Sequence, residues 1–165
     1  MIGESEDSFL RERLNPIVNP AKKFDECLKG TRLDLLEDVC DWAINSENTF
    51  AWICGIAGTG KSAVAVTLAQ RFRRMQNLVT LALTFHCVKG QETSNISLLV
   101  PTMCYQLAKV CPGYKRSLIS VFKEDQSLNG SGLPLNEQIQ QFLDASLFQP
   151  LPNKKVIAII DGLDE

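Results

Sequence analysis

The residues best suited to chemistry stand in one glycine-rich run, Gly55-Ile56-Ala57-Gly58-Thr59-Gly60-Lys61-Ser62. The run fits G-x-x-x-x-G-K-[ST], a pattern that cradles the phosphates of a nucleotide. Its glycines let the backbone turn tightly around an anion, and the following helix directs its positive end at the phosphates. The pattern predicts that Lys61 reaches the β- and γ-phosphates and that the Ser62 hydroxyl ligates Mg²⁺. The expected phosphate-binding set is Gly55, Ala57, Gly58, Thr59, Gly60, Lys61, Ser62 and Ala63.

The segments on either side of this loop are the ones that the pattern requires. Residues 50–54 form an apolar run that is typical of a buried strand. After the loop, Val64, Leu68 and Phe72 share one face of a predicted helix. A strand, a glycine loop and a helix in this order favour a phosphate-binding loop over an ordinary glycine-rich turn.

A second candidate group lies near the C-terminal end of the sequence. Residues 156–160 are all apolar and Asp161 follows them, which predicts a strand buried on both faces with a carboxylate at its tip. Ligands of open α/β sheets bind at the carboxyl ends of the strands. We therefore expect Asp161 and Ser62 to bind Mg²⁺ together. The alternative is a solvated turn after a core strand.

The remaining pattern predicts an α/β fold. A polar and helical arm is expected over residues 1–15, and a helix capped by Thr31 is expected to start near Arg32. A second strand is predicted over 78–87, with His86, the only histidine, near its end. Further helices are predicted from the apolar spacing over 96–110, 114–122 and 135–147.

Composition excludes several classes of function. The 165 residues are 45% hydrophobic, which is enough for one domain with a real core. The net charge of −2 offers no basic field for nucleic acid, and no run of 18 apolar residues predicts a membrane span. The acidic, polar start of the chain is unlike a targeting signal, so a soluble, cytoplasmic protein is expected. The scattered cysteines indicate reduced, buried thiols.

The run Asp161-Gly162-Leu163-Asp164-Glu165 resembles the magnesium-binding motif of the NACHT family of signal-transduction ATPases. Residues 27–32, with Trp42 beyond them, and residues 94–108 are similar to nephrocystin-3-like N-terminal proteins among fungal NLR-like receptors. The resemblance implies a P-loop NTPase fold, three-layer αβα with a parallel sheet, over residues 27–165, preceded by an arm and linker over 1–26. The implied cofactors are ATP or GTP and Mg²⁺.

The resemblance also assigns residues that spacing alone does not. It implies that Asp164 and Glu165 orient or deprotonate the attacking water. It places Gly30, Thr31 and Arg32 near the adenine, where the alternative is a helix start with a solvated arginine. It further implies a switch in innate immunity in which the nucleotide controls homo-oligomerisation, with an N-terminal effector domain and C-terminal repeats in the full protein.

The sequence ends directly after this motif, and the resemblance places a further strand between 50–54 and 156–160. We therefore expect a truncated domain, a weak ATPase alone, with either a vacant slot or direct pairing of those two segments. Two other functions stay open, a catalytically inactive nucleotide-binding or scaffold module and a small-molecule P-loop kinase. The kinase is disfavoured because the only arginine cluster, Arg71, Arg73 and Arg74, follows the loop helix. A small GTPase is disfavoured because no N-K-x-D signature occurs.

Overall fold

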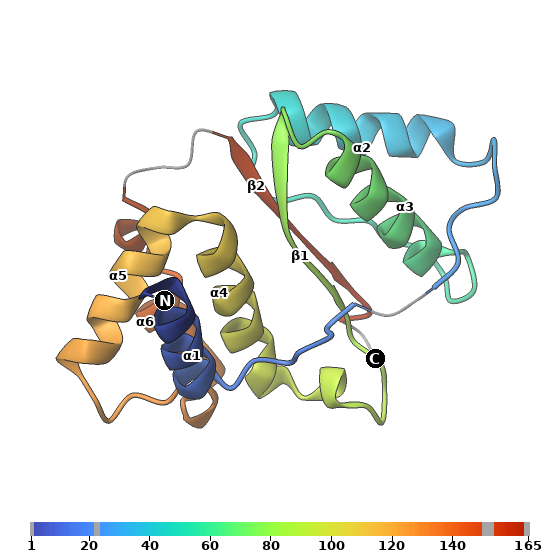
Figure 1. Ribbon diagram of the computed structural model, residues 1–165. Helices are drawn as coiled ribbons and strands as arrows, with labels where there is room; N and C mark the ends of the chain where they lie inside the picture. Colours follow the sequence, from blue (N-terminus) through green and yellow to red (C-terminus); the bar gives the residue numbers. More distant parts are fainter. Residues whose placement is uncertain (1, 22–23, 150–153, 164–165) are drawn as a thin grey trace. The chain divides into compact units, whose positions relative to one another are not determined.

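The computed structural model describes residues 2–21, 24–149 and 154–163, and its chain divides into two compact units (Figure 1). The helical unit comprises residues 1–20 and 88–153. The sheet unit comprises residues 21–87 and 154–165, and it contains every candidate site residue of the sequence. The predicted boundary between residues 26 and 27 stays a prediction.

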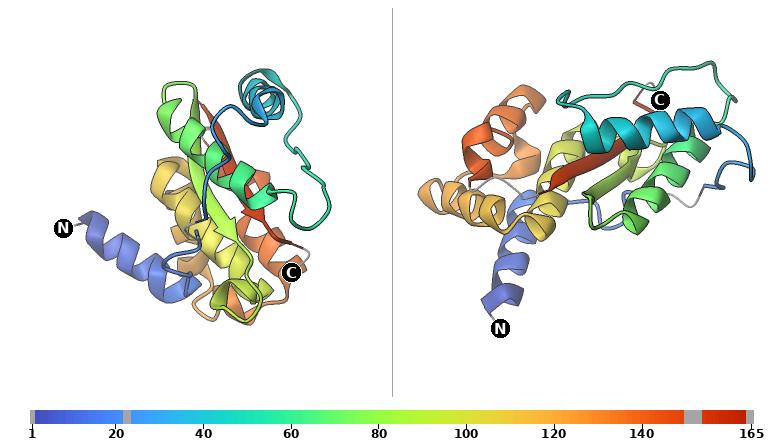
Figure 2. Two further views of the ribbon diagram at one scale, coloured as in Figure 1. Left: turned by 90° about the vertical axis from the view of Figure 1, so that its right-hand side faces the viewer. Right: turned by 90° about the horizontal axis from the view of Figure 1, so that it is seen from above.

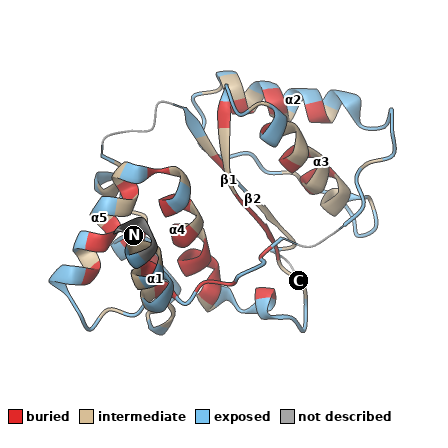
Figure 3. Cartoon of the chain, viewed as in Figure 1, coloured by how far each residue is buried: buried red, intermediate tan, exposed pale blue. Residues whose placement is uncertain are grey.

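The helical unit is built from α1 (Ile2–Leu14), α4 (Leu99–Val110), α5 (Pro112–Glu124) and α6 (Leu135–Phe142). Short 3₁₀ helices connect them at Glu92–Ser94, Ile96–Leu98, Gly130–Gly132 and Ala145–Phe148. Most of α4 is buried (Figure 3). The Tyr114 hydroxyl donates to the Phe142 carbonyl oxygen at 2.7 Å, which satisfies one polar group inside this core. No helix in the described part of the chain has the length and apolar character that a bilayer crossing requires.

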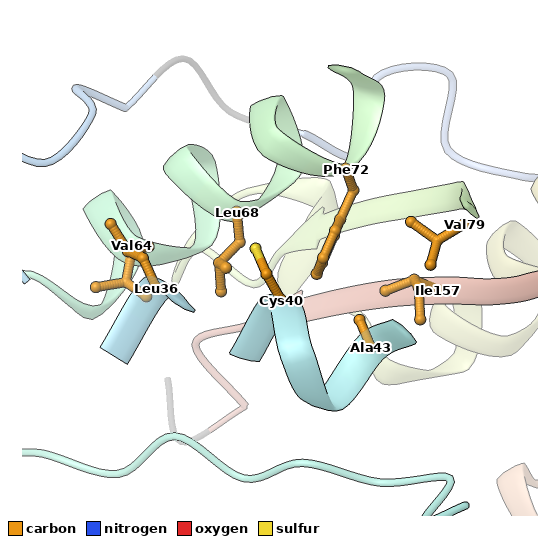
Figure 4. Close-up of a cluster of buried hydrophobic side chains, with 8 residues drawn as sticks. All are labelled: Leu36, Cys40, Ala43, Val64, Leu68, Phe72, Val79 and Ile157. Atoms are coloured by element: carbon orange, nitrogen blue, oxygen red, sulfur yellow. The ribbon is translucent and has the colours of Figure 1, made fainter. Parts of the chain in front are cut away.

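The sheet unit contains α2 (Leu33–Asn45), α3 (Lys61–Arg74), β1 (Val79–His86) and β2 (Lys155–Asp161). The two strands are parallel, and both helices lie beside them in each view (Figure 2). Apolar side chains from both helices and both strands form one core, which explains why the helices share a face of the sheet (Figure 4). Its members are Leu36, Cys40, Ala43, Val64, Leu68, Phe72, Val79 and Ile157.

The observed fold is therefore α/β with a small parallel two-stranded sheet. The predicted helices and the strands at 78–87 and 156–161 are confirmed within a few residues, except that the helix predicted over 135–147 ends at Phe142 and a separate 3₁₀ helix follows at Ala145–Phe148. The prediction that Thr31 caps α2 is wrong, because Arg32 occupies the cap position and no side chain caps it. The Thr31 hydroxyl instead donates to the Leu28 carbonyl oxygen at 2.7 Å, closing a turn before the helix.

The prediction of a strand at residues 50–54 is also wrong, because these residues have no regular secondary structure. Phe50 and Trp52 expose 68% and 64% of their surface, and their rings pack against each other. Among the described residues, no backbone hydrogen bond reaches this segment. An apolar run forms a strand only when a partner strand accepts its hydrogen bonds, and neither of the two described strands pairs with this segment.

A cavity of about 640 Å³ separates this segment from β2. Its walls include Trp52 and Ile53 on one side and residues 156–163 on the other, with Trp42 and Phe72 from the two helices. Of the two expected arrangements, direct pairing of residues 50–54 with β2 is wrong, because the described strands pair only β1 with β2, and the vacant slot of the implied family fold stays a prediction. The prediction that β2 is buried on both faces is wrong as well, because the strand borders this cavity and Ile157 is its only buried residue.

Candidate functional site

The glycine-rich loop is exposed and leads directly into the first turn of α3. Gly60 caps this helix with φ of 82°, a left-handed conformation that suits glycine because it has no side chain to clash. Lys61, Ser62 and Ala63 then form the first turn, whose N–H groups have no partner within a helix. The loop and turn therefore present backbone donors toward solvent at the positive end of a helix, which is an anion-binding arrangement.

The Lys61 ammonium folds back over the loop. Its Nζ donates to the carbonyl oxygens of Gly55 at 2.8 Å and Ile56 at 3.3 Å. The Thr59 hydroxyl donates to the same Ile56 oxygen at 2.8 Å and keeps the loop closed on itself. Because these carbonyls are exposed, phosphate oxygens can replace them as acceptors for the ammonium without leaving a buried group unpaired.

Asp161 is the last residue of β2, and its carboxylate faces the start of α3 and the end of β1. Its Oδ2 lies 3.0 Å from Nδ1 of His86. This hydrogen bond is the largest cause that holds the pKa of Asp161 below its ordinary value. Burial opposes the shift, while hydrogen bonding from Ser62 and the charge of Lys61 lower the pKa further. The carboxylate is therefore ionised at neutral pH, and Asp161 shares a cavity with Gly55 and Lys61 of the glycine-rich loop.

Gly162 follows this carboxylate with φ of 75°. A Cβ at this position would lie 2.7 Å from the carbonyl oxygen of Cys87, a backbone atom that cannot turn away. The Cys87 N–H donates to the Asp161 carbonyl oxygen at 2.8 Å, so a hydrogen bond joins the ends of β1 and β2 here. A glycine after Asp161 is what allows this close approach.

We expect Gly162→Ala to destabilise the sheet unit. The left-handed backbone costs an alanine about 1–2 kcal/mol, and the overlap with the Cys87 carbonyl adds about 1–3 kcal/mol. Denaturant unfolding followed by tryptophan fluorescence measures the loss, since Trp42 and Trp52 both belong to this unit. Gly30→Ala is the matched control, because its φ is 82° and nothing lies within 4 Å of the added Cβ. Equal losses in the two variants would contradict the clash.

The donor set fits a magnesium ion held beside a phosphate chain. Mg²⁺ prefers oxygen ligands and binds through one or two carboxylates together with substrate phosphates. The Asp161 carboxylate and the Ser62 hydroxyl supply such oxygens, and a hydrogen bond from Ser62 is among the causes that lower the pKa of Asp161. Ser62 comes from the helix that follows the phosphate-binding loop, so a metal held by both groups would also lie beside a bound phosphate.

Arg32 contacts the glycine-rich loop directly. It has φ of 54°, an unusual left-handed backbone for a residue with a side chain. Its guanidinium donates to the Thr59 carbonyl oxygen and lies 3.9 Å from the position of a Cβ on Gly60. The arginine is therefore not simply solvated at the start of α2. Gly30 and Thr31 precede it in an exposed turn, and their assignment to the adenine stays a prediction.

The structure places Gly55 and Lys61 of the loop on the same cavity as Asp161, and the binding of phosphate and Mg²⁺ by residues 55–63 and Asp161 stays a prediction. The predicted water-orienting acids, Asp164 and Glu165, lie outside the described residues. The sequence reasoning missed two contacts, that of His86 with Asp161 and that of Arg32 with Thr59. The position of His86 at the end of a strand was the available signal, because neighbouring parallel strands end at one edge of a sheet.

Comparison with protein-family models gives a match over most of the chain. The family model described as nephrocystin 3, N-terminal, matches residues 30–165, which include the loop, both strands and Asp161. Neither the search of curated proteins nor the search of solved structures finds a match.

Proposed function

This chain belongs to the nephrocystin 3 N-terminal family, and from that premise we propose that it binds ATP or GTP together with Mg²⁺. The nucleotide lies in the loop of residues 55–62, and the metal is held by Ser62 and Asp161. The domain is a NACHT-type P-loop NTPase that hydrolyses its nucleotide slowly. It acts as the nucleotide switch of an NLR-like signalling protein.

One observation carries this proposal. Lys61 comes from the first turn of α3, and Asp161 ends a strand far along the sequence, yet the two residues line one cavity together with Gly55 of the loop. A glycine-rich turn without a ligand has no need of a carboxylate beside it. A nucleotide site does need one, because the metal that neutralises the phosphates requires an anionic oxygen ligand.

Each group has a distinct role in this proposal. The N–H groups of the loop and of the first turn of α3 bind phosphate oxygens, and Lys61 exchanges its carbonyl partners for the β- and γ-phosphates. Asp161 and Ser62 hold the metal, which when bound neutralises the charge of the phosphate chain. Asp164 or Glu165 orients the attacking water.

The cavity beside β2 supports the P-loop NTPase part of the proposal. The family resemblance places a further strand between residues 50–54 and the strand that ends in Asp161. The cavity lies between these two segments, and the apolar residues 156–160 line its β2 side. Without a strand there, residues 50–54 lack a hydrogen-bonded neighbour, so we expect the 165-residue chain to hold the phosphate-binding loop loosely and to be a poor ATPase.

A nucleotide panel tests the proposed function. We expect ATP and ADP with Mg²⁺ to raise the unfolding temperature of the sheet unit, read from tryptophan fluorescence, and AMP to have little effect. The reason is that the contacts involve the β- and γ-phosphates; a ligand at 100 times its Kd stabilises by about 2.7 kcal/mol. GTP and tripolyphosphate measure the contribution of the base. Stabilisation by AMP equal to that by ADP, or none by any nucleotide, would contradict the assignment.

The scaffold alternative is distinguished by the oligomeric state. A switch should change its oligomer distribution between ATP and ADP, because only the γ-phosphate differs. A scaffold would show the same distribution with and without nucleotide. Light scattering of the chain with a non-hydrolysable ATP analogue, with ADP and without nucleotide separates the two.

A further inference from the structure

His86 lies at the end of β1, directly opposite Asp161 on β2. A register shift between Leu81 and Leu83 produces this pairing. The strands begin with Val79 opposite Lys155, and without the shift this register would bring His86 opposite Gly162. Bulges of this kind commonly occur next to functional sites, where they redirect a side chain. Here the irregularity places an imidazole beside the carboxylate of the proposed metal site.

The hydrogen bond between these two residues has a defined direction. An ionised carboxylate only accepts hydrogen bonds, so Nδ1 of His86 carries the hydrogen that is donated to Oδ2 of Asp161 at 3.0 Å. The carboxylate is thus held from the β1 side by His86, and Asp161 shares a cavity with Lys61 of α3. With Oδ2 engaged, the rotation of the Asp161 carboxylate is restricted.

The environment of the imidazole, at Nε2 and around the ring, indicates that His86 does more than fill space. His86 is only 1% exposed, and the ring of Phe24 lies edge-on to it with the centroids 5.0 Å apart. Its buried Nε2 has no hydrogen-bond partner among the described residues. An apolar side chain would fill the same space without burying an unpaired nitrogen. The benefit of an imidazole at this place is therefore its Nδ1 contact with Asp161.

We propose that His86 is a positioning residue that orients the Asp161 carboxylate for Mg²⁺ in the nucleotide complex. This inference rests on the proposed function, because the metal is the one bound with the nucleotide. Replacing a residue that hydrogen-bonds to a metal ligand but does not bind the metal itself typically weakens metal affinity about 10–100-fold. His86 acts through Asp161 and has no contact of its own with the phosphates in this proposal.

The test compares two variants of His86 in the 165-residue chain. His86→Leu fills the space but donates nothing, whereas His86→Asn keeps an amide donor close to the position of Nδ1. We expect His86→Leu to need about 10–100-fold more Mg²⁺ for the metal-dependent gain in ATP affinity, and His86→Asn to restore most of that loss. ATP affinity in EDTA should be the same in both variants and in the parent chain.

Thr84→Val is the matched control on the same strand. Thr84 is buried and its hydroxyl has no hydrogen-bond partner among the described residues, so valine keeps its volume and removes no contact. Its magnesium requirement should equal that of the parent chain. An unchanged magnesium requirement in His86→Leu would overturn the inference while leaving the proposed function intact. Absence of any ATP binding by the parent chain would overturn both.

A spectroscopic measurement does not depend on the folding of a variant. His86 is the only histidine, so the imidazole signals in a ¹⁵N-labelled NMR sample belong to it without further assignment. We expect Nδ1 to be the protonated nitrogen in the parent chain and both ring signals to shift when Mg²⁺ is added to the ATP complex. Saturable magnesium binding in the ATP complex that leaves the ring signals unmoved would overturn the positioning role.

Discussion

Lys61→Ala is expected to weaken ATP binding at least tenfold, which corresponds to about 1.4 kcal/mol or more. The substitution removes the ammonium that now contacts the carbonyl oxygens of Gly55 and Ile56 and that we assign to the phosphates. The fold should not change, because this ammonium contacts only exposed loop atoms. Isothermal titration with ATP and Mg²⁺ gives the affinity, and circular dichroism checks the fold.

The control for this substitution is Lys123→Ala. Lys123 is also a lysine of the protein surface, but it lies in the last turn of α5 in the helical unit. Its replacement changes the net charge by the same amount and should leave ATP affinity unchanged. If both variants lost affinity equally, the effect would be one of overall charge, and the assignment of Lys61 to the phosphates would be refuted.

Asp161→Asn is expected to abolish most of the gain in ATP affinity that Mg²⁺ provides. Asparagine keeps the size of the side chain and can still accept the hydrogen bond from His86, but it lacks the negative charge that the metal requires. A loss of at least tenfold in magnesium-dependent affinity, about 1.4 kcal/mol, is expected from titrations in Mg²⁺ and in EDTA. The ATP affinity of this variant in EDTA should not be lower than that of the parent chain. Without a metal, the Asp161 carboxylate repels the phosphates, and the substitution removes this repulsion.

Asp164→Asn and Glu165→Gln are the matched controls for this loss. They remove a carboxylate a few residues away, and the resemblance assigns both acids to water orientation, which matters only in the transition state. Each should therefore bind Mg²⁺ and ATP like the parent chain and hydrolyse ATP more slowly. An equal loss of magnesium dependence in all three variants would show that any nearby negative charge promotes magnesium binding. This result would contradict a specific role for Asp161.

The sequence predicts most of the elements because their patterns are local. The apolar spacing of Val64, Leu68 and Phe72 marks the buried face of α3, and that face does join the core of the sheet unit. The glycine-rich loop can also be predicted from the sequence. Its backbone has positive φ at Gly58 and Gly60, which favours glycine because glycine has no side chain. The apolar runs that became β1 and β2 are likewise visible, because each has a strand partner.

Other features depend on partners that a local pattern does not show. Residues 50–54 read as a buried strand, yet they stay irregular because the slot beside β2 holds no strand to pair with. The contact of His86 with Asp161 depends on a register shift in β1, which no spacing within one strand reveals. The contact of Arg32 with the phosphate-binding loop joins two segments separated by a whole helix.

The most direct measurement is a crystal structure of the chain with a non-hydrolysable ATP analogue and Mn²⁺, whose anomalous signal locates the metal. The account predicts that the triphosphate lies against the backbone of residues 55–62 and that the metal is ligated by the Ser62 hydroxyl and the Asp161 carboxylate. In this complex the Lys61 ammonium should contact the phosphates and no longer the Gly55 carbonyl oxygen. A metal peak away from Ser62 and Asp161, or a triphosphate bound elsewhere on the protein, would contradict the central claim.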